Sequence, residues 1–158
     1  MIHNIIKSDI LKSNESEIII QQVNCANKMG AGLAKAIYTK YPFVKGQYHD
    51  FCNYHYYNHI PLLGRFQICT IPNCNRIIIN VFGQQYYGRD NRRYTDYNAL
   101  TIAFNNIALY FMDSDVTFAI PYGIGAGLGG GDINYIMDII SNSLGTFNVK
   151  YYMKQLHT

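Results

Sequence analysis

Short apolar runs alternate with amphipathic segments along the chain, and this alternation constrains the fold more than any other feature. Several runs are apolar nearly throughout, as strands covered on both faces are. The predicted strands are Ile2–Lys7, Glu17–Val23, Phe66–Thr70, Ile77–Phe82, Val116–Ile120 and Val149–Met153. The predicted helices are Ala31–Tyr41, Val44–Tyr56, Thr95–Phe111 and Ile133–Leu144. This order predicts an α/β protein with three layers, α/β/α, around a mixed central sheet of about six strands.

The composition fits a single globular domain that spans residues 1–158. Hydrophobic residues make up 49% of the chain and charged residues 15%, which excludes a disordered protein. No apolar run approaches the ~18–20 residues of a membrane helix. The N-terminus carries no secretion signal, so we expect a cytoplasmic protein without a membrane partner. The net charge of +3 favours an anionic ligand weakly and is too small to imply nucleic-acid binding.

Neither the cysteines nor the histidines show the spacing of a metal site. The four cysteines contain no Cys-x-x-Cys pair, so we expect buried thiols rather than disulfides or zinc ligands. They are Cys25, Cys52, Cys69 and Cys74. His49 and His55 lie on one predicted helix without a third ligand, and a catalytic metal needs about three. We therefore predict no metal and no cofactor.

A strand, two asparagines and a glycine loop follow one another early in the chain. Asn24 and Asn27 come after the second predicted strand and are followed by Met29-Gly30-Ala31-Gly32-Leu33, where a helix begins. Glycine lets backbone N–H groups approach phosphate oxygens, and a helix N-terminus adds a favourable dipole. Asparagine side chains can hold sugar hydroxyls. The segment is therefore a candidate nucleotide site, although a tight strand-to-helix turn explains the same residues.

Six glycines fall within the nine residues 123–131, again between a predicted strand and a predicted helix. Each glycine in an ordered segment costs ~0.5–1 kcal/mol relative to alanine, so this number suggests a backbone that wraps closely around something. A flexible surface loop would use glycine as well. The segment has no Gly-Lys-Ser/Thr and does not follow the first strand, so it is neither a Walker loop nor a Rossmann fingerprint.

Together the two loops resemble the macro domain family. The likeness rests on the strand, asparagine pair, glycine loop and helix early in the chain, and on Pro121 with Gly125-Ala126-Gly127-Leu128 late in it. It is greatest to the small stand-alone branch with the yeast-type ADP-ribose 1″-phosphate phosphatase and the terminal ADP-ribose hydrolases. Short phage-encoded relatives look similar through Asn80-Val81-Phe82-Gly83-Gln84 and Tyr87-Gly88-Arg89-Asp90. The resemblance spans nearly the whole chain.

The resemblance implies roles for individual residues. Asp9 and Ile10 would meet the adenine, with Tyr152 nearby, although Asp9 can equally be a turn or cap residue and Tyr152 a core residue. Asn27 would bind the distal ribose, with Asn24 supporting the loop. The diphosphate and distal ribose would lie between two sets of loop residues. These are Met29, Gly30, Ala31, Gly32 and Leu33 on one side and Pro121, Gly125, Ala126, Gly127, Leu128 and Gly129 on the other.

The chain departs from the terminal hydrolases at the positions that matter for catalysis. Those relatives carry a lysine at the end of the central strand, where this chain has Gln84, and an aspartate directly after Gly-x-Gly-Leu, where it has Gly129. Gln84 and Asp132 are the remaining catalytic candidates, and Asp132 can also be the N-cap of the last helix. Tyr87 and Arg89 could form a lid that pairs with a terminal phosphate; a solvated loop or a nucleic-acid contact explains the same segment.

The leading hypothesis is an enzyme that binds ADP-ribose or a derivative and hydrolyses ADP-ribose 1″-phosphate to ADP-ribose and phosphate. Such chemistry would rest on phosphate held by the loops and an activated water. Two alternatives stay open: a non-catalytic module that binds ADP-ribose or a related signalling nucleotide, and a hydrolase that removes ADP-ribose from a macromolecule. Nucleic-acid binding rests only on the arginines and tyrosines and ranks below these.

Overall fold

One six-stranded sheet forms the centre of the protein. The structure is a computed structural model that describes residues 4–154. Its strands are β1 (Ile5–Ile6), β2 (Ile18–Asn24), β3 (Phe66–Thr70), β4 (Ile77–Gln84), β5 (Thr117–Pro121) and β6 (Asn148–Tyr152). They lie in the order β1-β6-β5-β2-β4-β3. β3 runs antiparallel to β4 and all other neighbours are parallel, so the sheet is mixed, with its antiparallel strand at an edge.

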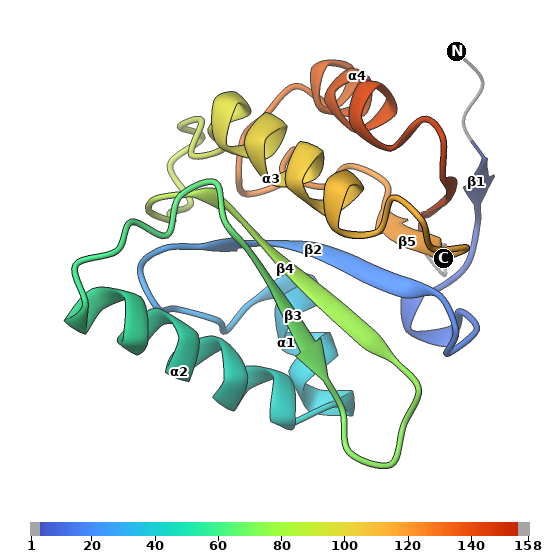
Figure 1. Cartoon of the computed structure of the whole chain (residues 1–158). Coiled ribbons are helices and arrows are strands. Elements are labelled where there is room, and N and C mark those ends of the chain that lie inside the picture. Colours follow the sequence, from blue (N-terminus) through green and yellow to red (C-terminus); the bar gives the residue numbers. More distant parts are fainter. Residues whose placement is uncertain (1–3, 155–158) are drawn as a thin grey trace.

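Two helices cover each face of this sheet (Figure 1). α1 (Gly32–Lys40) and α2 (Phe43–Tyr57) lie on one face, and α3 (Tyr97–Tyr110) and α4 (Ile133–Leu144) lie on the other. Successive side chains of β2 point to opposite faces of the sheet. Ile20 therefore joins the core under α3 and α4, while Ile19 packs towards α1. The predicted three-layer α/β/α fold is confirmed.

The predicted elements are all present, and most of their ends differ by one or two residues. The first predicted strand is the exception, because only Ile5–Ile6 are paired; Ile2 and His3 lie outside the described residues. α3 begins at Tyr97 rather than Thr95, because the Asp96 side chain accepts a hydrogen bond from Ala99 N at 2.9 Å and caps the helix. Thr95 is instead buried and bridges to β4.

A crevice forms between β2 and β5 because their connections diverge. β2 leads to α1 on one face of the sheet and β5 leads to α4 on the other. The two strands are neighbours, so the loops at their carboxyl ends separate at this point. Open α/β sheets bind ligands where the connections diverge in this way. The two glycine-rich loops, residues 25–31 and 122–132, are the loops in question.

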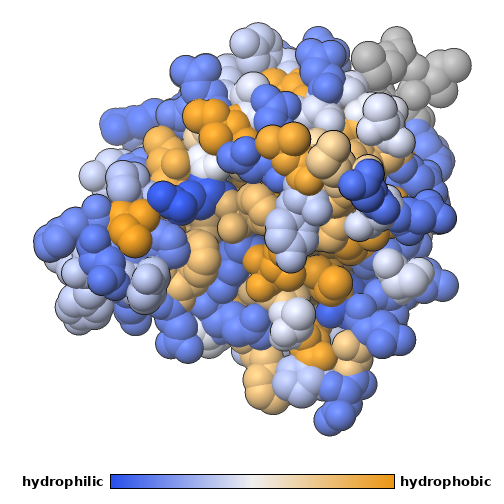
Figure 2. All heavy atoms as spheres, in the orientation of Figure 1, coloured by the Kyte–Doolittle hydropathy of each residue, from blue (hydrophilic) through white to orange (hydrophobic). Residues whose placement is uncertain are grey.

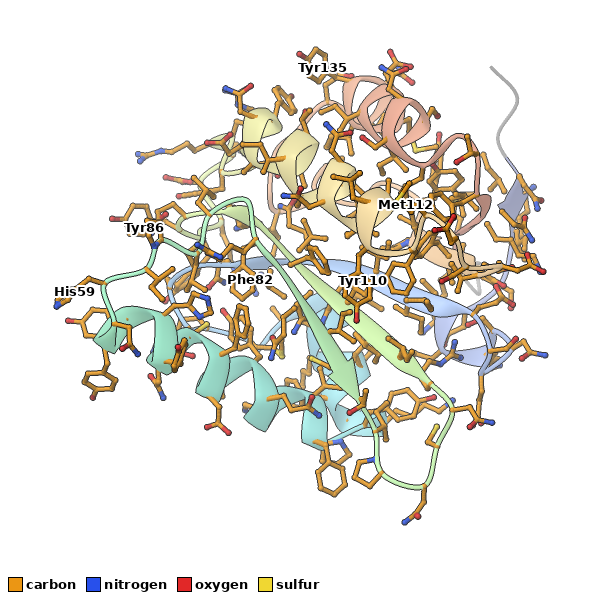
Figure 3. All side chains as sticks on the ribbon, in the orientation of Figure 1. His59, Phe82, Tyr86, Tyr110, Met112 and Tyr135 are labelled. Carbon is orange, nitrogen blue, oxygen red and sulfur yellow. The ribbon has the colours of Figure 1, made fainter. Side chains whose placement is uncertain are left out.

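Hydrophobic side chains are exposed at several places on the face shown in Figure 2. Figure 2 shows hydrophobic residues in separate places among hydrophilic ones on this face. Figure 3 shows Tyr110 and Met112 at the end of α3, and both are exposed. Single exposed apolar side chains are common in globular proteins. Within residues 4–154, no helix combines the length and the apolar character that crossing a membrane requires.

Candidate functional site

A cavity of about 950 Å3 occupies the crevice between the two glycine loops. This volume lies in the range that holds small-molecule ligands, ~300–1,000 Å3. The lining includes most of the residues that the sequence singled out. These are Asn24, Asn27, Met29, Gly30, Ala31, Gly32, Leu33, Gln84, Tyr87, Arg89, Pro121, Gly125, Gly127, Leu128 and Gly129.

The Asn24 side chain shapes the first glycine loop. Its Oδ1 accepts hydrogen bonds from the N–H groups of Ala26 (3.0 Å) and Lys28 (3.3 Å), and its Nδ2 donates to the Lys28 carbonyl at 2.8 Å. The Tyr48 hydroxyl donates to the Asn24 carbonyl at 2.8 Å. Tyr48 stacks on Phe82, which lies between the sheet and α2 (Figure 3). A side chain with fixed partners therefore sets the path of this loop.

The second glycine loop packs directly on side chains of the fold. Thr95 Oγ1 donates to the Gly125 carbonyl at 2.7 Å and accepts from Gln22 Nε2 at 2.9 Å. The Gly129 carbonyl accepts from Thr95 N at 2.9 Å. A Cβ atom on Gly129 would lie 2.5 Å from Thr95 Oγ1 and 2.7 Å from the Gly125 carbonyl oxygen. Close packing against Thr95 thus explains part of the glycine content, and a side chain does not fit at position 129.

The cavity is positively charged. Lys28, Lys45 and Arg89 line it, and no Asp or Glu is found among the described lining residues. Lys45 is half-buried, and its Nζ lies 4.5 Å from the centre of the Tyr38 ring. A concave site with charges of one sign concentrates ligands of the opposite sign. The arrangement therefore suits an anionic ligand, and backbone N–H groups of glycine loops suit phosphate in particular.

One imidazole lines the cavity. His49 Nδ1 lies within hydrogen-bond distance of Asn27 Oδ1, and Asn27 Nδ2 donates to Asn53 Oδ1 at 3.3 Å. Desolvation lowers the pKa of His49 below its usual value, and the positive charges of Lys45 and Lys28 lower it further. His49 is therefore mostly neutral at pH 7.

The thiols behind the first loop are not reactive. All four cysteines are free; Cys52 and Cys69 are buried, whereas Cys25 and Cys74 are only partly buried. Burial raises the pKa of Cys25 to about 12 and also raises that of Cys52. Both groups are protonated at neutral pH and are poor nucleophiles. Within residues 4–154, no three His, Cys, Asp or Glu side chains gather as a metal ion would require.

Some of the predicted site residues lie outside the cavity lining. The Asp9 side chain caps the short 3-10 helix η1 (Ile10–Lys12). The Tyr152 hydroxyl donates to Glu17 Oε1 at 2.7 Å, and its carbonyl accepts from Tyr122 N at 2.8 Å. Because Tyr122 lines the cavity, Tyr152 lies directly behind its wall. The residues that do not line the cavity are Asp9, Ile10, Ala126, Asp132 and Tyr152; a contact of these residues with ligand remains a prediction.

The two catalytic candidates are both engaged in structural hydrogen bonds. Gln84 lines the cavity, but its Oε1 accepts from Gln22 Nε2 and its Nε2 donates to the Tyr86 carbonyl, each at 2.7 Å. Asp132 accepts a hydrogen bond from Tyr135 N at 2.9 Å and caps α4. A catalytic role for either side chain stays a prediction.

The predicted lid residues, Tyr87 and Arg89, line the cavity and are exposed. Their segment is tied to the second glycine loop, because Tyr94 N donates to the Gly129 carbonyl at 2.8 Å. The Tyr94 hydroxyl donates to Asp90 Oδ1 at 2.7 Å. The segment is therefore anchored at the cavity, where Arg89 can reach a ligand.

The sequence reasoning missed several lining residues, among them Gln22, Lys45 and His49. Lys45 and His49 are four positions apart on a predicted helix, so they share a face. The sequence pattern pairs His49 with His55 as a possible metal site, whereas its spacing from Lys45 is the signal for this cavity. Gln22 alternates with Ile18 and Ile20, which indicates that it points to the α3 and α4 side of the sheet.

The fold is the one found in solved macrodomains. The chain is similar to a Bacteroides thetaiotaomicron protein of unknown function, with 23% identity, a TM-score of 0.83 and coverage of 96% of this chain and 98% of that one. The macrodomain of Mycobacterium tuberculosis DarG is 17% identical, with a TM-score of 0.78 and coverage of 98% of this chain and 99% of that one. Thermosipho africanus DarTG, solved in complex with ADP-ribose, is 15% identical, with a TM-score of 0.77. The match covers 97% of this chain and 42% of that one. Neither protein-family models nor curated sequences match the chain.

Proposed function

We propose that the cavity binds ADP-ribose or a derivative and hydrolyses ADP-ribose 1″-phosphate to ADP-ribose and phosphate. The observation that carries the proposal is a cavity between two glycine loops that holds three cations and no carboxylate among its described lining residues. That combination suits a ligand with several phosphate charges. The presence of ADP-ribose in the Thermosipho africanus DarTG complex supports the ligand class.

The ligand would lie across the crevice. Its diphosphate would contact the backbone of Gly30–Leu33 on one side and of Gly125–Gly129 on the other. Asn27 would hold the distal ribose, at the end of the cavity where Lys28, Lys45 and His49 also lie. The adenine would lie at the other end, near Tyr122 and the residues behind it, Asp9, Ile10 and Tyr152. A terminal phosphate on the distal ribose would then meet the lysines.

Calorimetric titration tests the binding half of the proposal. We expect heat with ADP-ribose and none with AMP, because AMP lacks the diphosphate and the distal ribose. Gly127→Glu should abolish binding, since it places a negative side chain in the lining. Gly46→Glu is the matched control: Gly46 does not line the cavity, and a Cβ atom there meets nothing within 4 Å. Equal affinity of both variants would show that the loop is not the binding site.

A single-turnover assay tests the reaction. Excess protein is mixed with ADP-ribose 1″-phosphate, and the release of inorganic phosphate is followed over time. We expect release above the buffer rate, and Gly127→Glu should remove it. Phosphate release at the buffer rate, with ADP-ribose binding intact, would overturn the phosphatase and leave a binding protein.

A non-catalytic module is the second candidate. Gln84 and Asp132, the side chains closest to the catalytic positions of the hydrolases, already have structural hydrogen-bond partners. The packing at Gly129 leaves no room for the aspartate of the terminal hydrolases, which argues against removal of ADP-ribose from macromolecules by their mechanism. Tight binding of ADP-ribose without turnover of any of these substrates favours the module.

Nucleic-acid binding has less support from the contacts. Arg92 pairs with Asp90 at 3.5 Å, and Arg93 lies over the Tyr97 ring at 4.4 Å. The Asp90 carboxylate offsets the charge of Arg92, and the Arg93 side chain is held against a ring, so the segment offers little free charge to a phosphate backbone. Oligonucleotide binding that falls steeply with salt and resists competition by ADP-ribose would reverse this ranking.

A further inference from the structure

One face of α2 is turned towards the first glycine loop. Lys45 and His49 line the cavity, and Asn53 accepts a hydrogen bond from Asn27 at 3.3 Å. These three residues follow one another at intervals of four, so they form a single stripe along the helix. The stripe meets Asn27, which has a left-handed φ of 63° at the tip of the loop.

The contacts of Asn27 favour one tautomer of His49. Because the Asn27 amide nitrogen donates to Asn53 Oδ1, its oxygen faces His49 Nδ1. An oxygen acceptor requires a proton on Nδ1, so the neutral ring carries its lone pair on Nε2. Asn27 therefore orients the ring in the way that a carboxylate or carbonyl orients other catalytic histidines.

Burial and two neighbouring lysines favour the neutral form of the His49 ring. Desolvation lowers its pKa first, Lys45 on the same helix and Lys28 on the facing loop lower it further, and Asp50 acts in the opposite direction. A neutral imidazole with an open lone pair can accept a proton at pH 7, whereas an imidazolium cannot. Its pKa, lower than usual, extends this capacity to weakly acidic solution.

No competing base is found among the described lining residues. They include no carboxylate, and Gln84 and Asn24 carry amides that do not take up protons. Lysine and arginine side chains are hydrogen-bond donors that offer no acceptor atom. His49 is the group whose protonation changes in the range where a hydrolase operates.

We propose that His49 is the general base of this cavity and that Asn27 is the residue that positions it; the proposal rests on the phosphatase function proposed above. His49 Nε2 takes a proton from water as the water oxygen forms a bond to the phosphorus of the terminal phosphate. The bond between phosphorus and the ribose O1″ breaks. The leaving oxygen receives the proton from the imidazolium, which gives ADP-ribose and inorganic phosphate. Lys28 and Lys45 offset the negative charge on the phosphate oxygens.

The test combines the rate of phosphate release, the affinity for ADP-ribose and the dependence of the rate on pH. Single-turnover phosphate release is measured between pH 5 and 8 for the unmodified protein and for His49→Gln, with ADP-ribose affinity from calorimetry. In the unmodified protein the rate should rise with pH, with a midpoint below the usual histidine pKa of about 6.5, and then level off. His49→Gln should lose about 10²–10⁴-fold in rate, keep its affinity and show no such midpoint.

Two further variants separate the positioning of the His49 ring by Asn27 from a general effect on folding. Asn27→Asp places a negative charge against the ring and should move the midpoint to higher pH, which a merely structural change would not do. His59→Asn is the matched control, because His59 lies beyond the end of α2 and does not line this cavity. It should leave both the rate and the midpoint unchanged.

The outcomes distinguish this proposal from the function on which it rests. No phosphate release from the unmodified protein overturns both. Release that His49→Gln leaves within about twofold overturns the role of His49 alone. Nitrogen NMR of the ring gives an independent result without turnover: a proton on Nδ1 and a pKa below 6.5 are expected, and a proton on Nε2 in the neutral ring overturns the proposal.

Discussion

The two glycine loops share one physical reason for using glycine and differ in another. In the first loop, a Cβ atom on Gly30 or Gly32 would meet nothing within 4 Å, and only Gly32 has a left-handed φ, of 57°. In the second loop, a Cβ atom on Gly129 would collide with Thr95 and with the loop itself. Both loops therefore use glycine for a left-handed φ, which Gly123, Gly125 and Gly130 have in the second loop. Only the second loop also contains glycines, such as Gly129, where the fold leaves no space for a side chain.

The largest effect is expected in the second loop. Gly129→Ala places a methyl group 2.7 Å from a backbone oxygen that cannot move freely, so the free energy of unfolding should fall by about 3 kcal/mol, at the upper end for overpacking. Gly127→Ala is the control, because its Cβ meets nothing within 4 Å and should change stability by less than about 0.5 kcal/mol. Urea unfolding measures both. Equal values for the two variants would remove the distinction between open and packed glycines.

An intermediate effect is expected where a side chain shapes the first loop. Asn24→Ala removes the acceptor of the Ala26 and Lys28 N–H groups, and we expect a loss of about 2 kcal/mol because solvent replaces only part of these bonds. Asn14→Ala is the control, since Asn14 makes similar turn contacts at an exposed site and should cost less than about 1 kcal/mol. Urea unfolding measures the free energy of unfolding of both variants. If Asn24→Ala is as mild as its control, the loop holds its shape without that side chain.

The smallest effect should separate the two glycines of the first loop. Gly32→Ala forces a left-handed φ on alanine and should cost about 1 kcal/mol, whereas Gly30→Ala has neither a left-handed φ nor a clash and should cost about 0. Thermal unfolding at matched concentrations detects the difference. A cost at Gly30 equal to that at Gly32 would mean that the left-handed φ is not what makes Gly32 costly to replace.

Much of the fold could be predicted because its signals are local. The apolar runs of β2 and β4 and the amphipathic pattern of α4 each specify an element within a few residues. Helix ends followed from capping only in part: α4 begins where Asp132 predicts, but the start of α3 was misplaced because Asp96, rather than the residue before Thr95, is the cap. The glycine loops could be placed because each follows a strand and precedes a helix.

The chemistry of the site could be predicted less well, because it depends on contacts between distant segments. Gln84 and Asp132 are catalytic candidates only by their positions in motifs, and in the structure Gln22 and the start of α4 occupy their hydrogen-bonding groups. The spacing of Lys45 and His49 places both on one face of their helix, but it does not reveal the contact of His49 with Asn27, which lies 22 positions earlier. The sequence pattern did not indicate that α2 faces this loop.

The sequence by itself determined the helices and strands, the three-layer fold with its mixed sheet, and the two glycine-rich loops between strands and helices. Periodicity, caps and glycine conformation act over a few residues, so these features can be seen locally. Only the tertiary structure decided that the second loop packs on Thr95 and Gln22, that the cavity collects Lys28, Lys45 and Arg89, and that Asn27 orients an imidazole. Those features arise from the strand order, which makes β2 and β5 neighbours with connections on opposite faces. Strand order is a property of long-range packing, and no local pattern encodes it.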